Sequence, residues 1–284
     1  MKKIILKFIK VPINNFKRKR NLYRPKLRFP LEIHMADHCN LNCKGCSHYS
    51  PISSPRFKTL KDLRDPLKKI SSYKIFFKEI RLLGGEPLLN PDLIEIIPLI
   101  RLFFPKIRII LVTNGLLLLN DKVCSKEFWE ILKKFDIELS ITIYPIELNI
   151  EKIKEMCSIK GIKYSIYGSR IKKGAFNLFL LNKSKSGDKR NYFHCTESEC
   201  LQLVDNRIFT CAQSAYVDKL NNKFGTSFKI LKQDYLDISK INLLKLLIFL
   251  NRPKPFCKYC LFPRPKTNWS LSKMDSKEWI RRMD

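Results

Sequence analysis

Cys39, Cys43 and Cys46 lie close together in the first part of the chain, in a C-x3-C-x2-C spacing. Three thiolates on one loop at this spacing can ligate one side of a cubic iron–sulfur cluster, and the fourth iron then remains open to another molecule. A structural zinc ion usually takes four protein ligands, often in spaced pairs, so an odd triplet fits zinc poorly. The cysteine triplet therefore predicts an iron–sulfur site.

Glycine-containing and polar motifs follow the triplet at the ends of apolar stretches. Residues 84–87 read Gly-Gly-Glu-Pro, residues 113–115 read Thr-Asn-Gly, and Thr142 lies in a further apolar stretch. Glycines let a backbone approach a ligand closely, and the Glu86 carboxylate can offset an ammonium group. Taken alone, residues 84–87 are a turn with a glutamate at a helix start, and Thr142 is a strand threonine chosen for β propensity.

Strands and helices alternate along the first part of the chain at intervals of roughly 30 residues. Alternation of this kind implies right-handed βαβ units and a parallel sheet. With a sixth strand at 176–181, the units are too few for a closed eight-unit barrel, so we expect an α/β fold built as a partial (β/α)6 TIM-like barrel. The expected strands are 31–36, 78–83, 106–113, 137–144 and 162–168, and the expected helices are 59–70, 91–104, 125–135 and 149–159.

These elements determine where the motifs meet. In parallel α/β folds, the chemistry lies at the carboxyl ends of the strands. The cysteine triplet, the glycine pair and the Thr-Asn pair all follow predicted strands. We therefore expect them to share one rim of the barrel.

The triplet together with these motifs resembles the radical S-adenosylmethionine (radical SAM) superfamily, over about residues 31–170. The resemblance implies a [4Fe–4S] cluster on Cys39, Cys43 and Cys46, whose open iron chelates the amino and carboxylate groups of SAM. One electron from the reduced cluster then cleaves SAM to methionine and a 5′-deoxyadenosyl radical that abstracts hydrogen from a substrate. The resemblance also implies a set of SAM-contacting residues: Gly84, Gly85, Glu86, Thr113, Asn114 and Thr142.

One position departs from the superfamily pattern. The residue before the third cysteine is usually aromatic and lies near adenine, but here it is Gly45. Adenine contact must then come from a backbone edge or from an aromatic side chain such as Tyr49. His38 and His48 flank the cysteine loop, where a solvated histidine is the ordinary case. The sequence assigns no catalytic acid or base.

Five of the ten cysteines lie in the last third of the chain. Cys257 and Cys260 form a C-x2-C pair, which alone suits zinc and iron–sulfur equally. Cys195, Asn206 and Cys211 resemble the C-x(9–15)-G-x4-C element of SPASM and Twitch auxiliary domains, with asparagine in the glycine's place, where it tolerates a left-handed turn. The Twitch resemblance implies an auxiliary [4Fe–4S] cluster on four cysteines: Cys195, Cys211, Cys257 and Cys260.

Three cysteines fall outside both sets. Cys200 is a spare residue, to be read as a free thiol, a substitute ligand or a hydrogen donor. Cys124 and Cys157 lie on predicted helices and are expected to be small core residues. A fully ligated auxiliary cluster has no open iron, so it would accept an electron from a substrate radical or hold its domain together.

Composition limits the class of protein. The 284 residues are 45% hydrophobic and 29% charged, which is typical of a globular chain and excludes a disordered one. Lys and Arg outnumber Asp and Glu by 55 to 26, and the net charge of +29 suits a solvated basic surface as well as binding to nucleic acid or anionic membranes. No segment reads as a membrane span. The N-terminus lacks the uncharged apolar region of an export signal, so we expect a cytoplasmic protein whose reduced cysteines are candidate metal ligands.

Changes in sequence texture divide the chain into three parts. We expect a basic N-terminal segment at 1–30, the radical SAM core at 31–182, and a Twitch-like auxiliary domain with a C-terminal tail at 183–284. Apolar residues at helical spacing between lysines in residues 4–9 suit peripheral membrane contact or packing on the domain.

The expected reaction is hydrogen abstraction from a sugar- or cyclitol-type small molecule, leading to dehydrogenation, dehydration or epimerisation, with a reductant such as flavodoxin or ferredoxin. The alternative is a radical SAM maturase of peptides or proteins. Such relatives often carry an N-terminal precursor-recognition domain, for which residues 1–30 leave no room. A remote alternative is a basic zinc-bound nucleic-acid-binding protein, although no recognition motif for nucleic acid is present.

Overall fold

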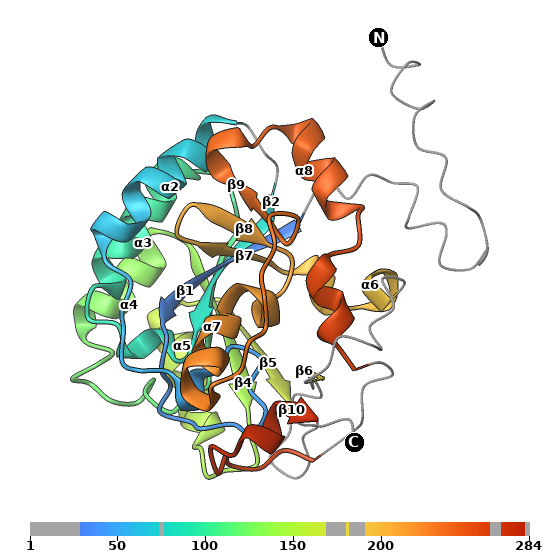
Figure 1. The fold of residues 1–284 in the computed structure, drawn as a ribbon. Helices are drawn as coiled ribbons and strands as arrows, with labels where there is room; N and C mark the ends of the chain where they lie inside the picture. Colours follow the sequence, from blue (N-terminus) through green and yellow to red (C-terminus); the bar gives the residue numbers. More distant parts are fainter. Residues whose placement is uncertain (1–28, 74–76, 169–179, 182–190, 262–267, 282–284) are drawn as a thin grey trace, which may run out of the picture.

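The computed structural model describes residues 29–73, 77–168, 180–181, 191–261 and 268–281 (Figure 1). The N-terminal segment expected to contact a membrane lies outside these residues. In the described part of the chain, a sheet of eight strands in the order β5-β4-β3-β2-β1-β7-β8-β9 forms the centre of the protein. The sheet carries the cysteine loop at the end of β1.

Five consecutive strands of this sheet are parallel, as the alternating pattern predicts. A row of side chains runs across four of them in register, and all are 0% exposed: Ile33, Leu82, Leu111 and Leu139. Parallel strands covered on both faces are apolar throughout, which explains the near-continuous hydrophobic runs in the sequence. The strands are β1 (Phe29–Ala36), β2 (Phe77–Gly84), β3 (Ile109–Thr113), β4 (Ile137–Ile143) and β5 (Tyr164–Gly168).

Helices connect these strands and pack side by side along the outside of the sheet (Figure 1). Thr59 and Asp62 form a capping box at the first of them, and the Ser125 side chain caps the third by accepting from a backbone N–H. Pro91 precedes the second helix instead of occupying its first position, because Asp92 is the N-cap. The helices are α2 (Leu60–Ser72), α3 (Leu93–Phe103), α4 (Lys126–Lys134) and α5 (Ile150–Lys160).

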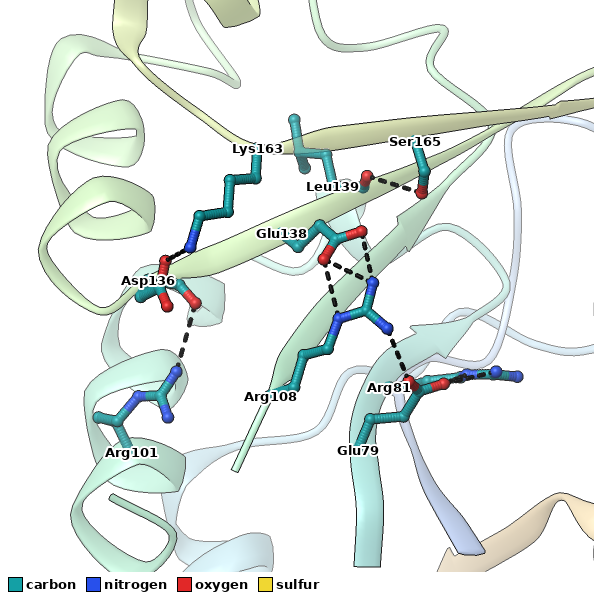
Figure 2. Close-up of polar contacts among 9 residues, drawn as sticks. All are labelled: Glu79, Arg81, Arg101, Arg108, Asp136, Glu138, Leu139, Lys163 and Ser165. Carbon is teal, nitrogen blue, oxygen red and sulfur yellow. Dashed lines mark hydrogen bonds and ion pairs between the residues drawn. The ribbon is translucent and has the colours of Figure 1, made fainter. Parts of the chain in front are cut away.

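Ion pairs connect the amino ends of β2, β3 and β4 (Figure 2). The Glu79 carboxylate is 2% exposed and accepts from Arg81 and from Arg108 at 3.0 Å. Arg108 also forms a forked pair with Glu138. This network lies at the end of the strands opposite the cysteine loop, so its role is to hold neighbouring strands together.

The last third of the chain extends the same sheet. β7 pairs in parallel with the free side of β1, and β8 and β9 follow as antiparallel strands. Sequence alone did not indicate that this part would join the barrel sheet. Its elements are β6 (Leu180–Leu181), α6 (Asn191–His194), β7 (Leu201–Val204), β8 (Arg207–Phe209), α7 (Ala212–Phe224), β9 (Tyr235–Asp237), α8 (Leu243–Leu250) and β10 (Ile280–Arg281).

Two local expectations need correction. Leu180 and Leu181, from the expected sixth barrel strand, pair with β10 in a separate small sheet, and residues 176–179 lie outside the described residues. β7 occupies the position beside β1. In the β7–β8 hairpin the left-handed residue is Asp205, at φ 52°, and not Asn206. Both residue types tolerate this conformation, so composition could not separate them.

A second hydrophobic cluster, here called the second core, lies apart from the main core of the sheet. It joins the cysteine loop to α7 and to the end of the chain. Short 3-10 helices flank it: η2 (Ser50–Ile52) and η6 (Pro255–Tyr259). Its buried members are Tyr49, Ala212, Tyr216, Val217, Leu220, Phe228, Phe256, Tyr259, Trp279 and Ile280.

Candidate functional site

A cavity of about 410 Å³ opens at the carboxyl ends of β1 to β4. All three cysteines of the triplet line it. It also brings together most of the residues that the resemblance implied, from strands far apart in the sequence. The lining residues are Cys39, Leu41, Cys43, Cys46, His48, Ser50, Leu83, Gly84, Gly85, Val112, Thr113, Asn114, Thr142 and Tyr144.

The cysteine loop is a tight series of turns. The backbone N–H of Cys46 donates to the Cys43 oxygen at 3.3 Å, and that of Leu41 donates to the Cys39 sulfur at 3.3 Å. Gly45 has φ 64°, in the left-handed region that glycine enters without steric cost. The structure thus gives a backbone reason for a glycine at the usually aromatic position.

The glycine pair allows the end of β2 to lie directly against the cysteine loop. Gly84 has φ 138°, and a Cβ on it would lie 2.4 Å from the Ala36 oxygen. A Cβ on Gly85 would lie 1.7 Å from the His38 oxygen. Because atoms cannot approach so closely, neither position accepts a side chain. The glycines are therefore required for chain packing at the first cluster ligand, as well as for access to the cavity.

Glu86 lies behind the cavity instead of lining it. The side chain is 1% exposed, and its oxygens accept from the Thr113 hydroxyl at 2.8 Å and from the Asn114 N–H at 2.9 Å. Burial raises the pKa of this carboxyl to about 7, although these hydrogen bonds oppose the rise. In this arrangement Glu86 fixes the turn after β3 and so positions the polar groups that do reach the cavity.

Asn114 connects that turn to the first cysteine. Its amide donates to the Asn40 side chain at 2.7 Å and lies 3.6 Å from the Cys39 sulfur. Thr142 lines the cavity from β4. Both side chains are therefore placed to contact polar groups of a cofactor bound in the cavity.

Several cavity residues were missed or not assigned at the sequence level. His48 and Ser50 follow the triplet, and Tyr144 follows Thr142 by two residues, so it extends along the same side of the chain. That period-two spacing was the available signal for Tyr144. His48 is half-buried, and its Nδ1 lies 2.5 Å from Nε2 of the buried His34, so it is a packed residue and not a solvated loop histidine.

The C-terminal strap, residues 268–281, covers the cysteine loop. Lys44 N–H donates to the Ser270 oxygen at 3.0 Å, and Ser272 N–H donates to the Asn42 oxygen at 2.8 Å. Trp269 packs against the loop and against Tyr144, with ring centres 5.5 Å apart. Trp279 is 1% exposed and donates its indole N–H to the Cys46 oxygen at 2.9 Å. No sequence motif predicted the contact between Trp279 and the cysteine loop.

Three of the later cysteines interact electrostatically in the structure. Burial, with smaller contributions from the Cys257 and Cys195 thiols, raises the pKa of Cys211 to about 12. Cys260 follows η6 and donates its N–H to the Cys257 oxygen at 3.2 Å. Cys200 lies elsewhere, where burial, then Glu32 and Glu197, raise its pKa.

Other sequence-level candidates also have clear positions. Tyr49 belongs to the second core and does not line the cavity. Cys124 and Cys157 lie in the main core at 2% and 0% exposure, which confirms them as small core residues, although Cys124 precedes α4 instead of lying on it.

The donor set fits an iron–sulfur cluster. Three thiols line one cavity. Burial raises the pKa of Cys39 to about 12, which favours the neutral thiol, and bound iron would reverse this preference because it ligates the thiolate. Within the described ranges, no three His, Cys, Asp or Glu side chains are grouped closely enough for a single metal ion. A cubic cluster separates its ligands further than one ion does. No helix among the described residues is long and apolar enough to cross a membrane.

Comparison with known proteins identifies the class. Residues 33–166 match the sequence pattern of the Radical SAM superfamily, and this segment contains β1 to β5 up to Ile166, the cysteine triplet and the motifs at 84–87 and 113–115. Over these residues the chain therefore has the sequence pattern of the radical SAM superfamily, whose members are iron–sulfur, SAM-binding enzymes. The α/β partial-barrel prediction is confirmed.

The most similar curated relatives include GTP 3′,8-cyclase of Clostridium perfringens (strain 13 / Type A), 33% identical over 141 residues, which are 48% of this chain and 40% of that protein. GTP 3′,8-cyclase of Aquifex aeolicus (strain VF5) is 37% identical over 131 residues, 44% and 38% of the two chains. The chain thus spans about 40% of the length of these relatives.

Among solved structures, BtrN in complex with AdoMet and 2-DOIA superposes with a TM-score of 0.51 at 14% identity, covering 82% of this chain and 92% of that one. At this level of identity, the likeness shows a shared fold.

Proposed function

We propose that this protein holds a [4Fe–4S] cluster on Cys39, Cys43 and Cys46, binds SAM in the adjoining cavity, and abstracts hydrogen from a sugar- or cyclitol-type small molecule. When bound and reduced, the cluster and SAM supply a 5′-deoxyadenosyl radical. The observation that carries the proposal is the single cavity lined by all three cysteines together with the glycine pair and the polar turn after β3. At about 410 Å³ it is of the size of a small-molecule pocket.

The residues of the chain have separate tasks at this cavity. Asn114 lies beside the first cysteine and offers an amide to polar groups of SAM, while Glu86 holds the turn that presents it. Gly84 and Gly85 line the cavity and let the end of β2 lie directly against the cysteine loop. Thr142 offers a hydroxyl from the next strand. With Gly45 lacking a side chain, we assign adenine contact to Tyr144, which lines the cavity.

We further propose that Cys195, Cys211, Cys257 and Cys260 hold an auxiliary [4Fe–4S] cluster of the Twitch type, within an auxiliary domain at residues 183–284. The Cys257 and Cys195 thiols both raise the pKa of Cys211, which supports grouping these three, and Cys200 lies with another group of charges. In an oxidative reaction, such a cluster would take the electron left on the substrate. A one-electron reductant of the flavodoxin or ferredoxin type would supply the first cluster.

The choice of a small polar substrate over a peptide has modest physical support. BtrN, which shares the fold, was solved with AdoMet and 2-DOIA, a combination of cofactor and small ligand. The cavity of this chain is lined by hydroxyl, amide and imidazole groups, which suit a molecule rich in hydroxyl or amino groups. Modification of a peptide is the outcome that the substrate test would have to exclude.

Anaerobic iron and sulfide analysis with Mössbauer spectroscopy tests the cluster assignment. We expect about 8 iron per chain, falling to about 4 in a Cys39/Cys43/Cys46→Ala variant, with loss of SAM cleavage to 5′-deoxyadenosine. Incubation with deuterated polyols, aminocyclitols and unmodified peptides, followed by mass analysis of 5′-deoxyadenosine, tests the substrate class. Deuterium transfer from peptides alone would refute the sugar-type proposal, and an iron-free chain would refute the function.

A further inference from the structure

Tyr49 occupies an unusual backbone position three residues after the last cysteine of the triplet. Its φ is 57° and its ψ is 25°, the left-handed region, which a bulky residue enters only at a steric cost. Glycine or asparagine would satisfy this turn more cheaply. Strain of this kind persists where the side chain has a task. Its N–H donates to the Cys46 oxygen at 3.0 Å, so the residue is anchored directly to the first cluster loop.

The Tyr49 side chain ends in a buried hydroxyl with no hydrogen-bond partner among the described residues. The residue is 1% exposed, within the second core. Removing a phenol hydroxyl from water without giving it a new partner is unfavourable. A group of this kind is expected to have a partner in the complete protein.

The second core, which holds the Tyr49 side chain, borders the auxiliary cysteine set. Ala212, next to Cys211, is a member of the second core, and Cys260 packs against it. Burial raises the pKa of Tyr49 well above its ordinary value, and the thiols of Cys211, Cys260 and Cys46 raise it further. Tyr49 is therefore bonded through its backbone to the first cysteine loop, and its side chain lies in a core against which Cys260 packs.

We propose that the Tyr49 hydroxyl donates a hydrogen bond to a sulfur of the auxiliary cluster, at Cys211 or Cys260, and is a positioning residue that raises the reduction potential of that cluster. The inference rests on the auxiliary cluster of the proposed function. A donor aimed at a cluster sulfur stabilises the reduced, more negative state. The backbone N–H of the same residue donates to the Cys46 oxygen, so Tyr49 would connect the two cluster sites.

Tyr216 provides a matched control. It is also in the second core, is 7% exposed, and has a buried hydroxyl without a hydrogen-bond partner in the described part of the chain. Its charged neighbours are carboxylates, chiefly Asp37, and the Lys219 ammonium, which lies 4.8 Å from the ring centre; its ring stacks on His34 at 3.9 Å. Tyr216→Phe therefore removes a comparable hydroxyl that does not face the cysteines.

The test uses full-length chains carrying Cys39/Cys43/Cys46→Ala, so that only the auxiliary cluster remains to be measured. Tyr49→Phe and Tyr216→Phe are added separately, and the clusters are reconstituted anaerobically and titrated by EPR. We expect Tyr49→Phe to lower the midpoint potential by about 59 mV, a tenfold change in the one-electron equilibrium. We expect Tyr216→Phe to leave it unchanged. Without iron, Tyr49→Phe should unfold at the same or a higher denaturant concentration, because an unpartnered hydroxyl is lost.

The outcomes separate the two proposals. A chain that retains about 4 iron but shows equal potentials in all variants overturns the role of Tyr49 and leaves the auxiliary cluster standing. Equal shifts in both phenylalanine variants overturn it as well, because the effect is then not specific to the cysteine side. A chain without iron in this background refutes the auxiliary cluster, and the inference with it. If the iron-free Tyr49→Phe protein is destabilised, the hydroxyl already has a protein partner and the inference is also wrong.

Discussion

The contact between Trp279 and the Cys46 oxygen makes a quantitative test of the C-terminal strap possible. Trp279→Phe removes the 2.9 Å indole hydrogen bond and leaves a small void in a site that is 1% exposed. The Cys46 oxygen keeps the Tyr49 N–H as a donor, so it is not left unpaired, and the lost bond should cost only about 1–1.5 kcal/mol. At about 1.4 kcal/mol per factor of ten, the cysteine loop should open roughly tenfold more often.

The assay is the rate at which an iron chelator removes iron from the reconstituted protein under anaerobic conditions. We expect Trp279→Phe to lose the first cluster roughly tenfold faster than the unsubstituted chain, with the auxiliary cluster slower to respond. Trp129→Phe is the control, because Trp129 is 4% exposed in the main core on α4, away from the strap. Equal rates of iron loss in the two variants would show that the strap does not hold the loop.

Three further predictions address the remaining parts of the structure. Gly85→Ala should abolish binding of the first cluster, because the new Cβ would collide with backbone atoms. The Cβ of Gly225→Ala meets nothing within 4 Å, so this variant should lose only about 1 kcal/mol of folding stability through its φ of 62°. Iron content and thermal unfolding would check both variants. Burial lowers the pKa of His34 from 6.5 to about 4, so the unfolded chain binds more protons than the folded one between these pH values. The free energy of unfolding should therefore fall as pH drops through this window, by about 3 kcal/mol in all. Urea unfolding of His34→Phe should show a weaker dependence of stability on pH, and an unchanged dependence would contradict the assignment. Glu79→Ala should destabilise the protein by about 1–3 kcal/mol in thermal unfolding without altering iron content, since its ion pairs lie at the far end of the sheet; iron loss would contradict that separation.

The parallel strands and the first cluster loop could be predicted because their signals are local. The β-branched and leucine runs at β1 to β4 identify buried parallel strands, and Gly84 and Gly85 mark a close approach of two backbones. The spacing of Cys39, Cys43 and Cys46 fixes three donors on one loop whatever the rest of the chain does. Each of these inferences needed only residues near one another in the sequence.

Other features depend on contacts between distant segments. Glu86 reads as a ligand for a cofactor, but its carboxylate accepts from the turn after β3, which no spacing rule reveals. The pairing of β7 with β1 and the separate pairing of residues 180–181 with β10 join segments that are far apart in the sequence. Trp279 carries no motif, and its role is visible only once the chain is folded. The hydroxyl of Tyr49 likewise became informative only through its burial.

The strap has a consequence for the order in which the protein is made. Trp279 and Cys46 are 233 residues apart, so at about 5–20 residues per second the cysteine loop leaves the ribosome some 10–50 s before its cover exists. During that interval the three thiols belong to an unfinished site, open to oxidants and to the wrong metal.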